Sequence, residues 1–440
     1  MKKKDVFSTG VHLLETITAG MYNDPLMIFR EYIQNAVDSI DIATEKKSNK
    51  RFTINIKLDP INKSILIRDN AHGIDAHSAE SYLSAIGASF KSGTSARGFR
   101  GIGRLGGIAF CNRLIFRTSG PRQKMVSEQS WDCIELRKIL SQSHNNGHLS
   151  INKVLNQIVS FKQSKTKNIN DSFFEVLLEE VYSYKNLLLD FQKVRKYITE
   201  TAPIAFNKKE FEFARKVTTF LKKYVSGYRP YSISLNDHPL YKPYTNAVPV
   251  MKGADDTLTD IEFFEIKKEP NELLAVGWLG LREEMKGAIR RGDLRGGIRI
   301  RVGDIMLGNS FLLNDHFREP RFNHYCVGEI HLISKKLIPN GRRDDLIDNE
   351  YKGIFYNEFE RVIGLPLSKE IRRRSINLEL ITEVSKDKSM ANPPSPIIPH
   401  GTLNKIERKH KLKEIEDVLL ECNDCEKVIR IKKKLLCTIK

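Results

Sequence analysis

Apolar residues recur every three or four positions in the stretch from Ile28 to Ile40, which reads IFREYIQNAVDSI. Phe29, Ile33 and Val37 continue one stripe along the surface of a helix. This spacing predicts a helix that packs one face against the body of a folded domain.

The same helix carries polar residues on a second stripe. Glu31, Asn35 and Asp38 lie at positions i, i+4 and i+7, with Arg30 beside them. Burying these groups costs several kcal/mol unless a metal, a phosphate or hydrogen-bond donors meet them. A surface helix with a hydrated polar face is the alternative.

Alternating apolar and polar residues predict strands after this helix, which would form the sheet that it packs against. Residues 51–58 and 63–68 form a hairpin about the turn at 59–62, and Asp69 follows the second strand. Further strands are expected at 113–118, 127–136 and 172–181. A polar insertion with some helix is expected at 142–170, and a linking helix at 187–199, before Pro203.

The remainder of the chain becomes rich in strands and then helical. Strands are expected at 231–235, 263–266, 273–281, 297–307 and 327–333, followed by a helix that starts at Pro366 and runs to Val384. We therefore expect a first domain at 1–182, a linker helix at 183–204, a second domain at 205–365 and a helical tail at 366–440. A proline-rich linker interrupts the tail at 386–401.

A glycine-rich run, GFRGIGRLGGIAF, spans Gly98 to Phe110 and precedes an apolar strand. Glycine lacks a Cβ, so such a loop can wrap closely around phosphate oxygens with its backbone N–H groups. On its own, this is a weak indication of a nucleotide site.

Four stretches in a fixed order make the indication specific. They are Glu31-x-x-x-Asn35-Ala36-x-Asp38, then Asp69 to Gly73, then Lys91-Ser92-Gly93-Thr94, then Ile102-Gly103-x-x-Gly106. Together they resemble the nucleotide-binding boxes of the GHKL superfamily: DNA gyrase B subunits, HtpG-type heat-shock chaperones, MutL and the MORC proteins. The residues of these motifs most resemble those of the HtpG-type chaperones and the bacterial Hsp-like and MORC-like ATP-binding proteins. Ala71 departs from the family pattern, in which a glycine stands at that place of the second box.

The resemblance implies a Bergerat-type α/β sandwich that binds ATP and Mg²⁺, followed by a transducer or middle-type α/β domain. It implies that Glu31 is the general base, that Asn35 is a ligand of Mg²⁺ and that Asp38 orients these neighbours. Asp69 would accept a hydrogen bond from the adenine amino group. The remaining nucleotide contacts would come from Gly73, Lys91, Ser92, Gly101, Ile102, Gly103, Gly106 and Ser172. Ser172 is equally well explained as a serine at a strand edge.

A second arginine-containing motif lies in the later domain. Asn340-x-x-Arg343-Asp344 resembles a chaperone loop whose arginine reaches the γ-phosphate, which makes Arg343 the first candidate and Arg342 the second. Lys335 and Lys336 are alternatives, because gyrase-type transducers use a lysine. A surface cluster neutralised by neighbouring aspartates is the plainer explanation.

Composition narrows the class of protein. The 440 residues suggest two or three domains, and 40% hydrophobic with 29% charged residues is ordinary for a globular protein. No apolar run approaches the roughly 20 residues that span a bilayer. The lysine-containing start is interrupted by polar residues, so we expect no signal peptide, no membrane and a cytoplasmic location. Six cysteines agree with reduced thiols.

The formal charge of +18 allows a nucleic-acid partner, phosphate chemistry or a merely lysine-rich composition. Arginines and one lysine between Gly280 and Arg301 would suit a nucleic-acid-facing loop, or a solvated one: Arg282, Lys286, Arg290, Arg291, Arg295, Arg299 and Arg301. Cys422 and Cys425, with His410 and Cys437, could form a zinc clip, but only one Cys-x-x-Cys pair is present.

These features favour an ATPase whose nucleotide-driven clamp acts on a macromolecular partner. The resemblance implies a homodimer that ATP closes through the N-terminal segment, with chaperone-like action on a protein client. A MORC- or MutL-like clamp on DNA, or an ATP-sensing component of a phage-defence system, is the alternative. A histidine kinase is disfavoured, because no phosphoacceptor-histidine helix precedes the site.

Overall fold

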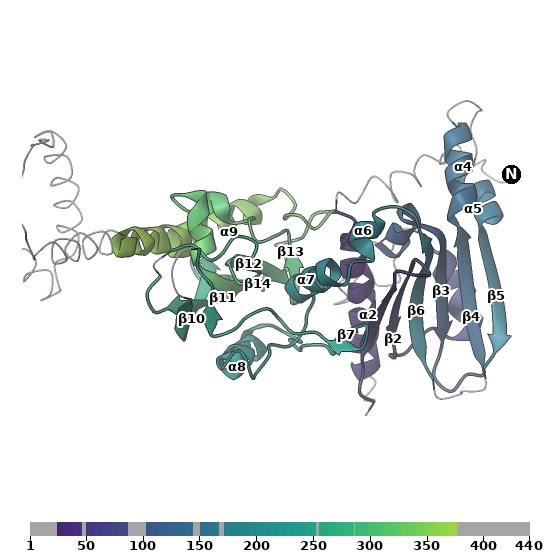
Figure 1. Ribbon diagram of the computed structural model, residues 1–440, viewed down its shortest axis with the longest axis horizontal. Helices are drawn as coiled ribbons and strands as arrows, with labels where there is room; N and C mark the ends of the chain where they lie inside the picture. The colour runs from purple at the N-terminus through teal and green to yellow at the C-terminus, as the bar shows by residue number, and fades with distance from the viewer. Residues whose placement is uncertain are drawn as a thin grey trace, which may run out of the picture. The chain divides into compact units, whose positions relative to one another are not determined.

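The computed structural model describes residues 24–45, 50–86, 103–143, 150–166, 171–251, 255–285 and 287–375. The described residues all belong to one compact unit, which lies within residues 1–379. This unit is mixed α/β, with two mixed sheets and packed helices (Figure 1). The expected α/β fold class is confirmed.

An eight-stranded sheet forms the first half of the unit. Its spatial order is β5 (Val159–Lys165), β4 (Met125–Asp132), β3 (Cys111–Ser119), β6 (Phe173–Val181), β2 (Ser64–Asp69), β1 (Ile54–Asp59), β7 (Ile233–Leu235) and β8 (His238–Pro239). Neighbouring strands are antiparallel except β1 and β7, which are parallel. The expected hairpin of β1 and β2 is confirmed, with Ile56 opposite Ile67.

Alternation along β2 places a charged residue, Asp69, on the same core face as two isoleucines. Ile65 and Ile67 are buried, and Asp69, two positions further, is buried as well. Helix α2 (Met27–Glu45) packs on β2, and its apolar stripe joins the same core. The helix predicted from Ile28 to Ile40 is thereby confirmed.

The other helices that the structure describes in this half are short. They are α3 (Ala76–Ser84), the 3₁₀ segment η1 (Gly103–Ala109), α4 (Cys133–Ser143), α5 (Ile151–Ile158), α6 (Lys185–Leu188) and α7 (Phe191–Thr201). Of these elements, η1, which lies within the glycine-rich run, packs beside α2.

Three local predictions need correction. The strand expected at 127–136 ends at Asp132, because the Asp132 carboxylate accepts a hydrogen bond from the Glu135 N–H (2.9 Å) and so caps α4. The polar stretch 142–170 contains the edge strand β5, whose exposed side chains hid its alternation. The linking helix begins at Phe191, because Asp190 caps α7 by accepting from the Lys193 N–H (2.9 Å).

A six-stranded sheet follows, in the order β13 (Ile305–Leu307), β12 (Gly297–Val302), β14 (Val327–Leu332), β11 (Glu272–Arg282), β10 (Asp256–Lys268) and β9 (Ala247–Val248). Helix α8 (Ala214–Tyr224) belongs to the core on one face of this sheet, and α9 (Glu350–Phe359) to the core on the other. Short 3₁₀ segments, η2 (Asn314–His316) and η3 (Pro320–Tyr325), connect β13 to β14. The strand expected at 231–235 pairs with β1 and so joins the first sheet.

The helix expected to start at Pro366 begins earlier. It starts as α9, continues through the π-helical turn η4 (Glu360–Gly364) and remains helical over 365–375. Proline lacks the N–H of a regular helical bond, and the wider π turn just before it accommodates that loss. Residues 376–440, which include the expected linker and tail, lie outside the described residues.

Among the helices that the structure describes, none is long and apolar enough to cross a bilayer.

Candidate functional site

The carboxylate of Glu31 lies against the backbone of Gly103, within the glycine-rich run. A Cβ built on Gly103 would stand 2.4 Å from Glu31 Oε2, so a larger residue at 103 would displace the carboxylate. Glu31 is partly buried, with 15% of its side chain exposed, and its Oε1 is 3.3 Å from Arg30 Nη2. The general-base candidate therefore points at the expected nucleotide loop.

Two side chains hold η1 in this position. The Tyr32 hydroxyl accepts a hydrogen bond from the Gly107 N–H (2.9 Å), which ties the segment to α2. Arg104 donates to the carbonyl oxygens of Tyr82 (3.1 Å) and Ala85 (2.6 Å), at the end of α3. Gly103 and Gly106, both expected nucleotide contacts, thus lie in a segment anchored at two points.

Asp69 lies at the far end of the same helix face. Its Oδ1 accepts hydrogen bonds from the Ala71 N–H (3.0 Å) and from the Ser39 hydroxyl (3.5 Å). Only 2% of Asp69 is exposed, and this burial raises the pKa of its carboxyl to about 7. The carboxyl therefore takes up a proton at a higher pH than an ordinary aspartate does.

Glu31, Asn35 and Ser39 form one row, because they occupy every fourth position of α2. The row extends about 12 Å from the carboxylate beside Gly103 to the hydroxyl beside Asp69. Asn35, in the middle, is partly exposed, and Asp38 is buried at 2% exposure. The structure thus places the predicted acid and amide, Glu31 and Asn35, in one row, with Asp38 buried beside it.

The turn after Asp69 depends on Gly73. Its φ is +65°, and a Cβ there would lie 2.0 Å from the Ser119 carbonyl oxygen. The Ser172 hydroxyl donates to the Ala71 carbonyl oxygen (2.6 Å) and so braces the same turn. Ala71, which replaces the family glycine, is accommodated in the core at 1% exposure.

The loop with the arginine candidates lies near α2. Arg30 Nη2 donates to the Arg342 carbonyl oxygen at 3.0 Å, while the Arg342 side chain is exposed. Arg343 is partly buried at φ +56°, and its carbonyl oxygen accepts from the Gly308 N–H (2.9 Å). The loop that carries both arginines is therefore connected to the helix that carries Glu31.

The alternative lysines differ from these arginines. Lys336 is ion-paired with Glu272 (3.2 Å) and hydrogen-bonded to Tyr351, which directs it toward β11 and α9. Lys335 is exposed. The hydrogen bond that connects this part of the chain to α2 is made by the Arg342 carbonyl oxygen, not by either lysine.

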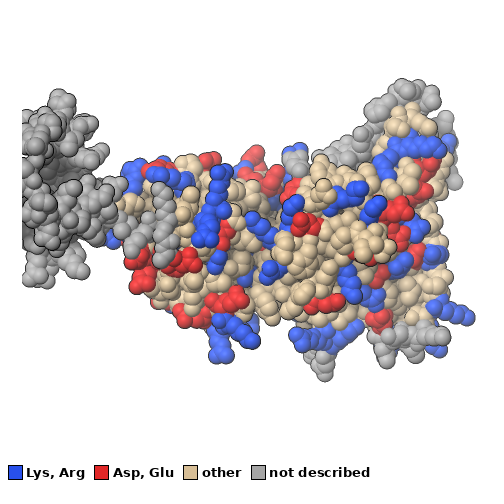
Figure 2. Space-filling view, viewed as in Figure 1, with Lys and Arg blue, Asp and Glu red and all other residues tan. Residues whose placement is uncertain are grey.

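Both explanations offered for the arginines between Gly280 and Arg301, a nucleic-acid-facing loop and a solvated loop, are wrong for three of them. Arg282, Arg299 and Arg301 are at most 2% exposed, and each is paired with an internal carboxylate. Arg295 is paired with Asp293 (2.6 Å). Basic and acidic side chains are also interspersed over the face in Figure 2. Of the described basic residues in this stretch, Arg290 and Arg291 are the exposed ones.

The described residues contain one group with the composition of a metal site. Oxygen or nitrogen atoms of Asp304, Glu329 and His331 lie within 4.8 Å of one another. However, the Lys242 ammonium is 2.8 Å from Asp304 Oδ1 and 3.1 Å from Glu329 Oε1. A lysine therefore supplies the positive charge that a metal ion would bring.

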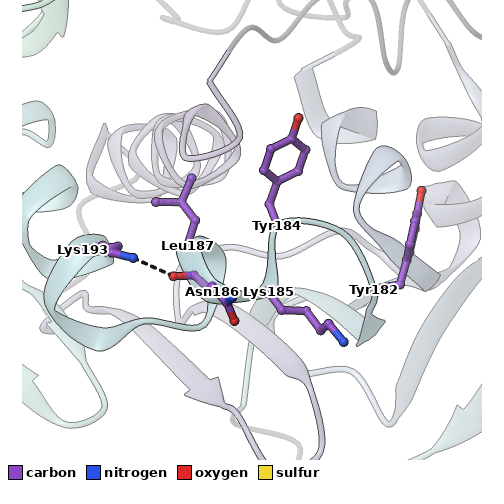
Figure 3. Close-up of a pocket in the computed structure, with 6 residues that line it drawn as sticks. All are labelled: Tyr182, Tyr184, Lys185, Asn186, Leu187 and Lys193. Atoms are coloured by element: carbon purple, nitrogen blue, oxygen red, sulfur yellow. Dashed lines mark hydrogen bonds between the residues drawn. The ribbon is translucent and has the colours of Figure 1, made fainter.

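A hollow of about 450 Å³ lies beside α6, lined by Tyr182, Tyr184, Lys185, Asn186, Leu187 and Lys193 (Figure 3). Lys193 Nζ donates to the Asn186 carbonyl oxygen (2.9 Å) within it. None of these six residues is among the predicted nucleotide contacts.

Four of the predicted contacts, Lys91, Ser92, Gly101 and Ile102, lie outside the described residues, as do the candidate zinc ligands. One residue and one contact in the site carried no prediction. Ser39 was detectable, since it extends the Glu31 and Asn35 spacing by one more turn. The bond from Arg30 to residue 342 spans 312 positions and has no local signal.

Residues 27–170 match the family model described as "Histidine kinase-, DNA gyrase B-, and HSP90-like ATPase". This match supports the GHKL superfamily for the part of the chain that carries α2, the glycine-rich run and the Asp69 turn. Among curated proteins, no significant match to the chain was found. Members of this ATPase family bind ATP, typically with Mg²⁺, so the match supports ATP binding and hydrolysis by this chain in general terms. Members of the family also commonly dimerise.

Proposed function

We propose that this protein is a Mg²⁺-dependent ATPase whose nucleotide lies along the Glu31, Asn35 and Ser39 row of α2. One observation carries the proposal: the row begins at a carboxylate that lies against the Gly103 backbone and ends at the Ser39 hydroxyl, beside the buried carboxyl of Asp69. A nucleotide needs different chemistry at its two ends, and the row offers it.

Adenine would bind at the Asp69 end. An ionised Asp69 accepts a hydrogen bond from the adenine amino group, whereas guanine presents a carbonyl oxygen at that place and would be repelled. The pKa of about 7 means that the binding form must compete with a protonated one. The Ser172 bond to Ala71 supports the turn on which this contact depends.

The phosphates would lie toward Asn35 and the glycine run. A partly exposed amide oxygen is a suitable ligand for Mg²⁺, which prefers oxygen donors, and backbone N–H groups of glycines suit phosphate oxygens. Bound Mg²⁺ would offset the charge of the phosphates. Lys91, Ser92, Gly101 and Ile102 are proposed to complete this end.

Glu31 is the proposed general base, which would orient the attacking water and accept its proton. Arg30 holds one oxygen of this carboxylate, and Gly103 leaves room for the other. Asp38, buried about two helical turns after Glu31, is proposed to fix the orientation of the helix face.

Arg343, with Arg342 second, is proposed to stabilise charge on the γ-phosphate. Most of the catalysis in phosphoryl transfer comes from positioning and charge stabilisation, so hydrolysis would depend on this loop being docked. The bond from Arg30 to the Arg342 carbonyl supports a docked position beside α2.

The proposed output is ATP-driven closure of a homodimeric clamp with chaperone-like action on a protein client. A DNA-associated clamp, or an ATP sensor in phage defence, is the alternative. The burial of Arg282, Arg299 and Arg301 removes the arginine-rich loop as support for DNA, although the charge of +18 remains.

The test is phosphate release by the purified chain, alone, with double-stranded DNA and with an unfolded protein. Sedimentation with and without a non-hydrolysable ATP analogue reports the dimer. Stimulation by unfolded protein alone supports the chaperone-like role, and stimulation by DNA alone supports the alternative. Absence of both turnover and ATP binding would overturn the proposal.

A further inference from the structure

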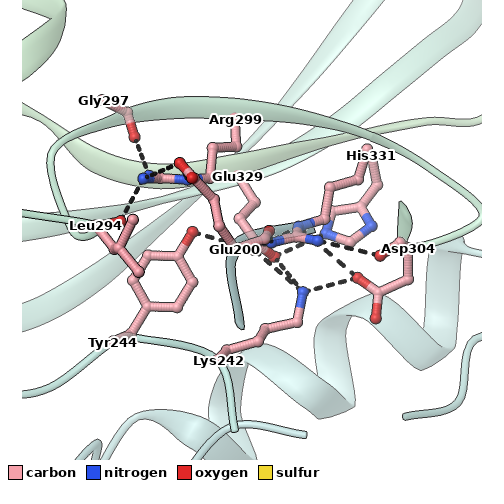
Figure 4. A network of polar contacts seen from close by, with 10 residues as sticks. Glu200, Lys242, Tyr244, Leu294, Gly297, Arg299, Asp304, Glu329 and His331 are labelled. Carbon is pink, nitrogen blue, oxygen red and sulfur yellow. Dashed lines mark hydrogen bonds and ion pairs between the residues drawn. The ribbon is translucent and has the colours of Figure 1, made fainter. Parts of the chain in front are cut away.

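The two halves of the described unit are joined by a second polar connection, which lies at the end of α7 (Figure 4). Glu200 Oε1 accepts hydrogen bonds from Arg299 Nη2 (2.9 Å) and Nε (3.1 Å). The Glu200 carbonyl oxygen accepts from Arg301 Nη2 (2.9 Å). Both arginines lie on β12 of the second sheet, whereas α7 packs in the core of the first.

This connection is buried, and it is balanced in charge. Arg299 is 1% exposed and Arg301 0%, and the Glu200 side chain is 18% exposed. Arg301 also pairs with Glu329, which itself receives hydrogen bonds from Lys242 and from the Tyr244 hydroxyl (3.1 Å). A buried guanidinium that loses its carboxylate is left uncompensated, so the arginines favour the docked position of α7 strongly.

The strand that carries these arginines leads directly to the arginine loop. β12 pairs with β13, in which Arg301 is opposite Met306 and Ile300 is opposite Leu307. The next residue, Gly308, donates its N–H to the Arg343 carbonyl oxygen (2.9 Å). Gly308 has a φ of +62°, and a Cβ there would meet the Asp344 carbonyl oxygen at 2.7 Å. The hairpin therefore supports the loop closely.

The contacts close into a ring. The loop accepts a hydrogen bond from Arg30 of α2, α2 packs on α7, and α7 holds β12 through Glu200. α7 also contacts β13 directly. Every link in this ring is a packed element or a hydrogen bond, so displacement at Glu200 has a short physical route to residues 342 and 343.

We infer that Glu200 is a positioning residue, which acts through Arg299 and the β12–β13 hairpin to hold the Arg342–Arg343 loop beside Glu31. The inference rests on the proposed ATPase function for its effect on turnover. It predicts that weakening the Glu200–Arg299 ion pair slows hydrolysis without weakening ATP binding.

The experiment compares Glu200→Gln, Arg299→Gln and the double variant in the full chain. Glu128→Gln is the matched control, because Glu128 is 14% exposed and pairs with Arg117 (2.6 Å) within the first sheet alone. We expect kcat to fall about tenfold in both single variants, with the ATP dissociation constant within twofold of the wild type. The double variant should be no slower than the slower single variant, because both changes remove the same link.

Hydrogen exchange without nucleotide separates this inference from the proposed function. Backbone amides at 338–347 should exchange faster in Glu200→Gln than in the wild type and Glu128→Gln. If the wild type proves to have no ATPase activity, this exchange still decides whether Glu200 holds the loop. Unchanged exchange, or multiplying effects in the double variant, would overturn the inference.

Discussion

Arg30 Nη2 is 3.0 Å from the Arg342 carbonyl oxygen and 3.3 Å from Glu31 Oε1, so one nitrogen atom joins the second-half loop to the candidate base. Arg30 and Arg342 are 312 positions apart in sequence. The relationship makes the position of the loop and the orientation of the carboxylate mutually dependent. Substitutions on either side should therefore affect turnover more than binding.

Glu31→Ala should abolish turnover and preserve ATP binding. Removal of a general base costs about 10²–10⁴-fold in rate, whereas Glu31 is not an expected ligand of the nucleotide. Phosphate release and calorimetric titration with ATP measure the two effects separately.

The control for that substitution is Glu45→Ala, at the exposed end of the same helix. It should leave both measurements unchanged. Equal rates of phosphate release from Glu31→Ala and the wild type would remove Glu31 from the mechanism.

Arg343→Ala should slow hydrolysis by at least about tenfold, with binding intact, because a desolvated guanidinium stabilises charge that develops on the γ-phosphate. Arg343 has a φ of +56°, which alanine tolerates poorly, so Arg343→Gly is the better variant for removing the side chain alone. Steady-state kinetics on both variants measure the effect. Lys335→Ala is the comparison, and a slow Lys335→Ala with a normal Arg343→Gly would assign the role to the lysine.

Asp69→Asn should abolish measurable ATP binding, because an amide presents both donor and acceptor where the site needs an acceptor. The pKa of about 7 adds a pH dependence in the wild type. The carboxylate form is lost as the pH falls below 7, so affinity should fall about tenfold per pH unit there. Titration calorimetry with ATP at several pH values, from about 5.5 to about 8, measures how the affinity changes around that pKa. A flat profile would contradict the adenine assignment.

Asp69 should also make the wild type less stable at high pH. Its pKa is 3.8 in the unfolded reference and about 7 in the fold, so the folded state holds a proton that the unfolded chain releases. This contribution is fully present below the lower pKa and is lost as the pH rises through about 7. Asp69→Asn removes this pH dependence. Its free energy of unfolding, taken relative to that of the wild type, should therefore rise by roughly 3 kcal/mol when the pH is raised from about 5 to about 8. Denaturant unfolding at the two pH values measures the gain, and an equal effect at both would show that the carboxyl is not buried.

Local pattern was sufficient for much of this molecule. Helix α2, the β1–β2 hairpin and the glycine at 73 all follow from spacing and turn chemistry within about 20 residues. The β12 arginines were misjudged for the opposite reason. Their partners, Glu200 and Glu329, are 99 and 28 positions away, so composition could not distinguish buried ion pairs from a basic surface. The helix starts after Asp132 and Asp190 could have been predicted from the sequence, because each aspartate immediately precedes its helix and caps it.

Gly73→Ala should destabilise the protein, and the reason lies in the backbone rather than in any nucleotide contact. At φ +65° a side chain is strained, and the new Cβ would stand 2.0 Å from the Ser119 carbonyl oxygen and 2.7 Å from that of Phe173, on two neighbouring strands. Because both obstacles are backbone atoms, the turn must move, at a cost we expect to exceed about 2 kcal/mol. Gly353→Ala, in α9, is the matched control: its Cβ would meet nothing within 4 Å, so it should stabilise the helix by roughly 0.5–1 kcal/mol. Chemical denaturation of the two variants measures both effects. A Gly73→Ala protein as stable as the wild type would mean that the Asp69 turn does not have the conformation described.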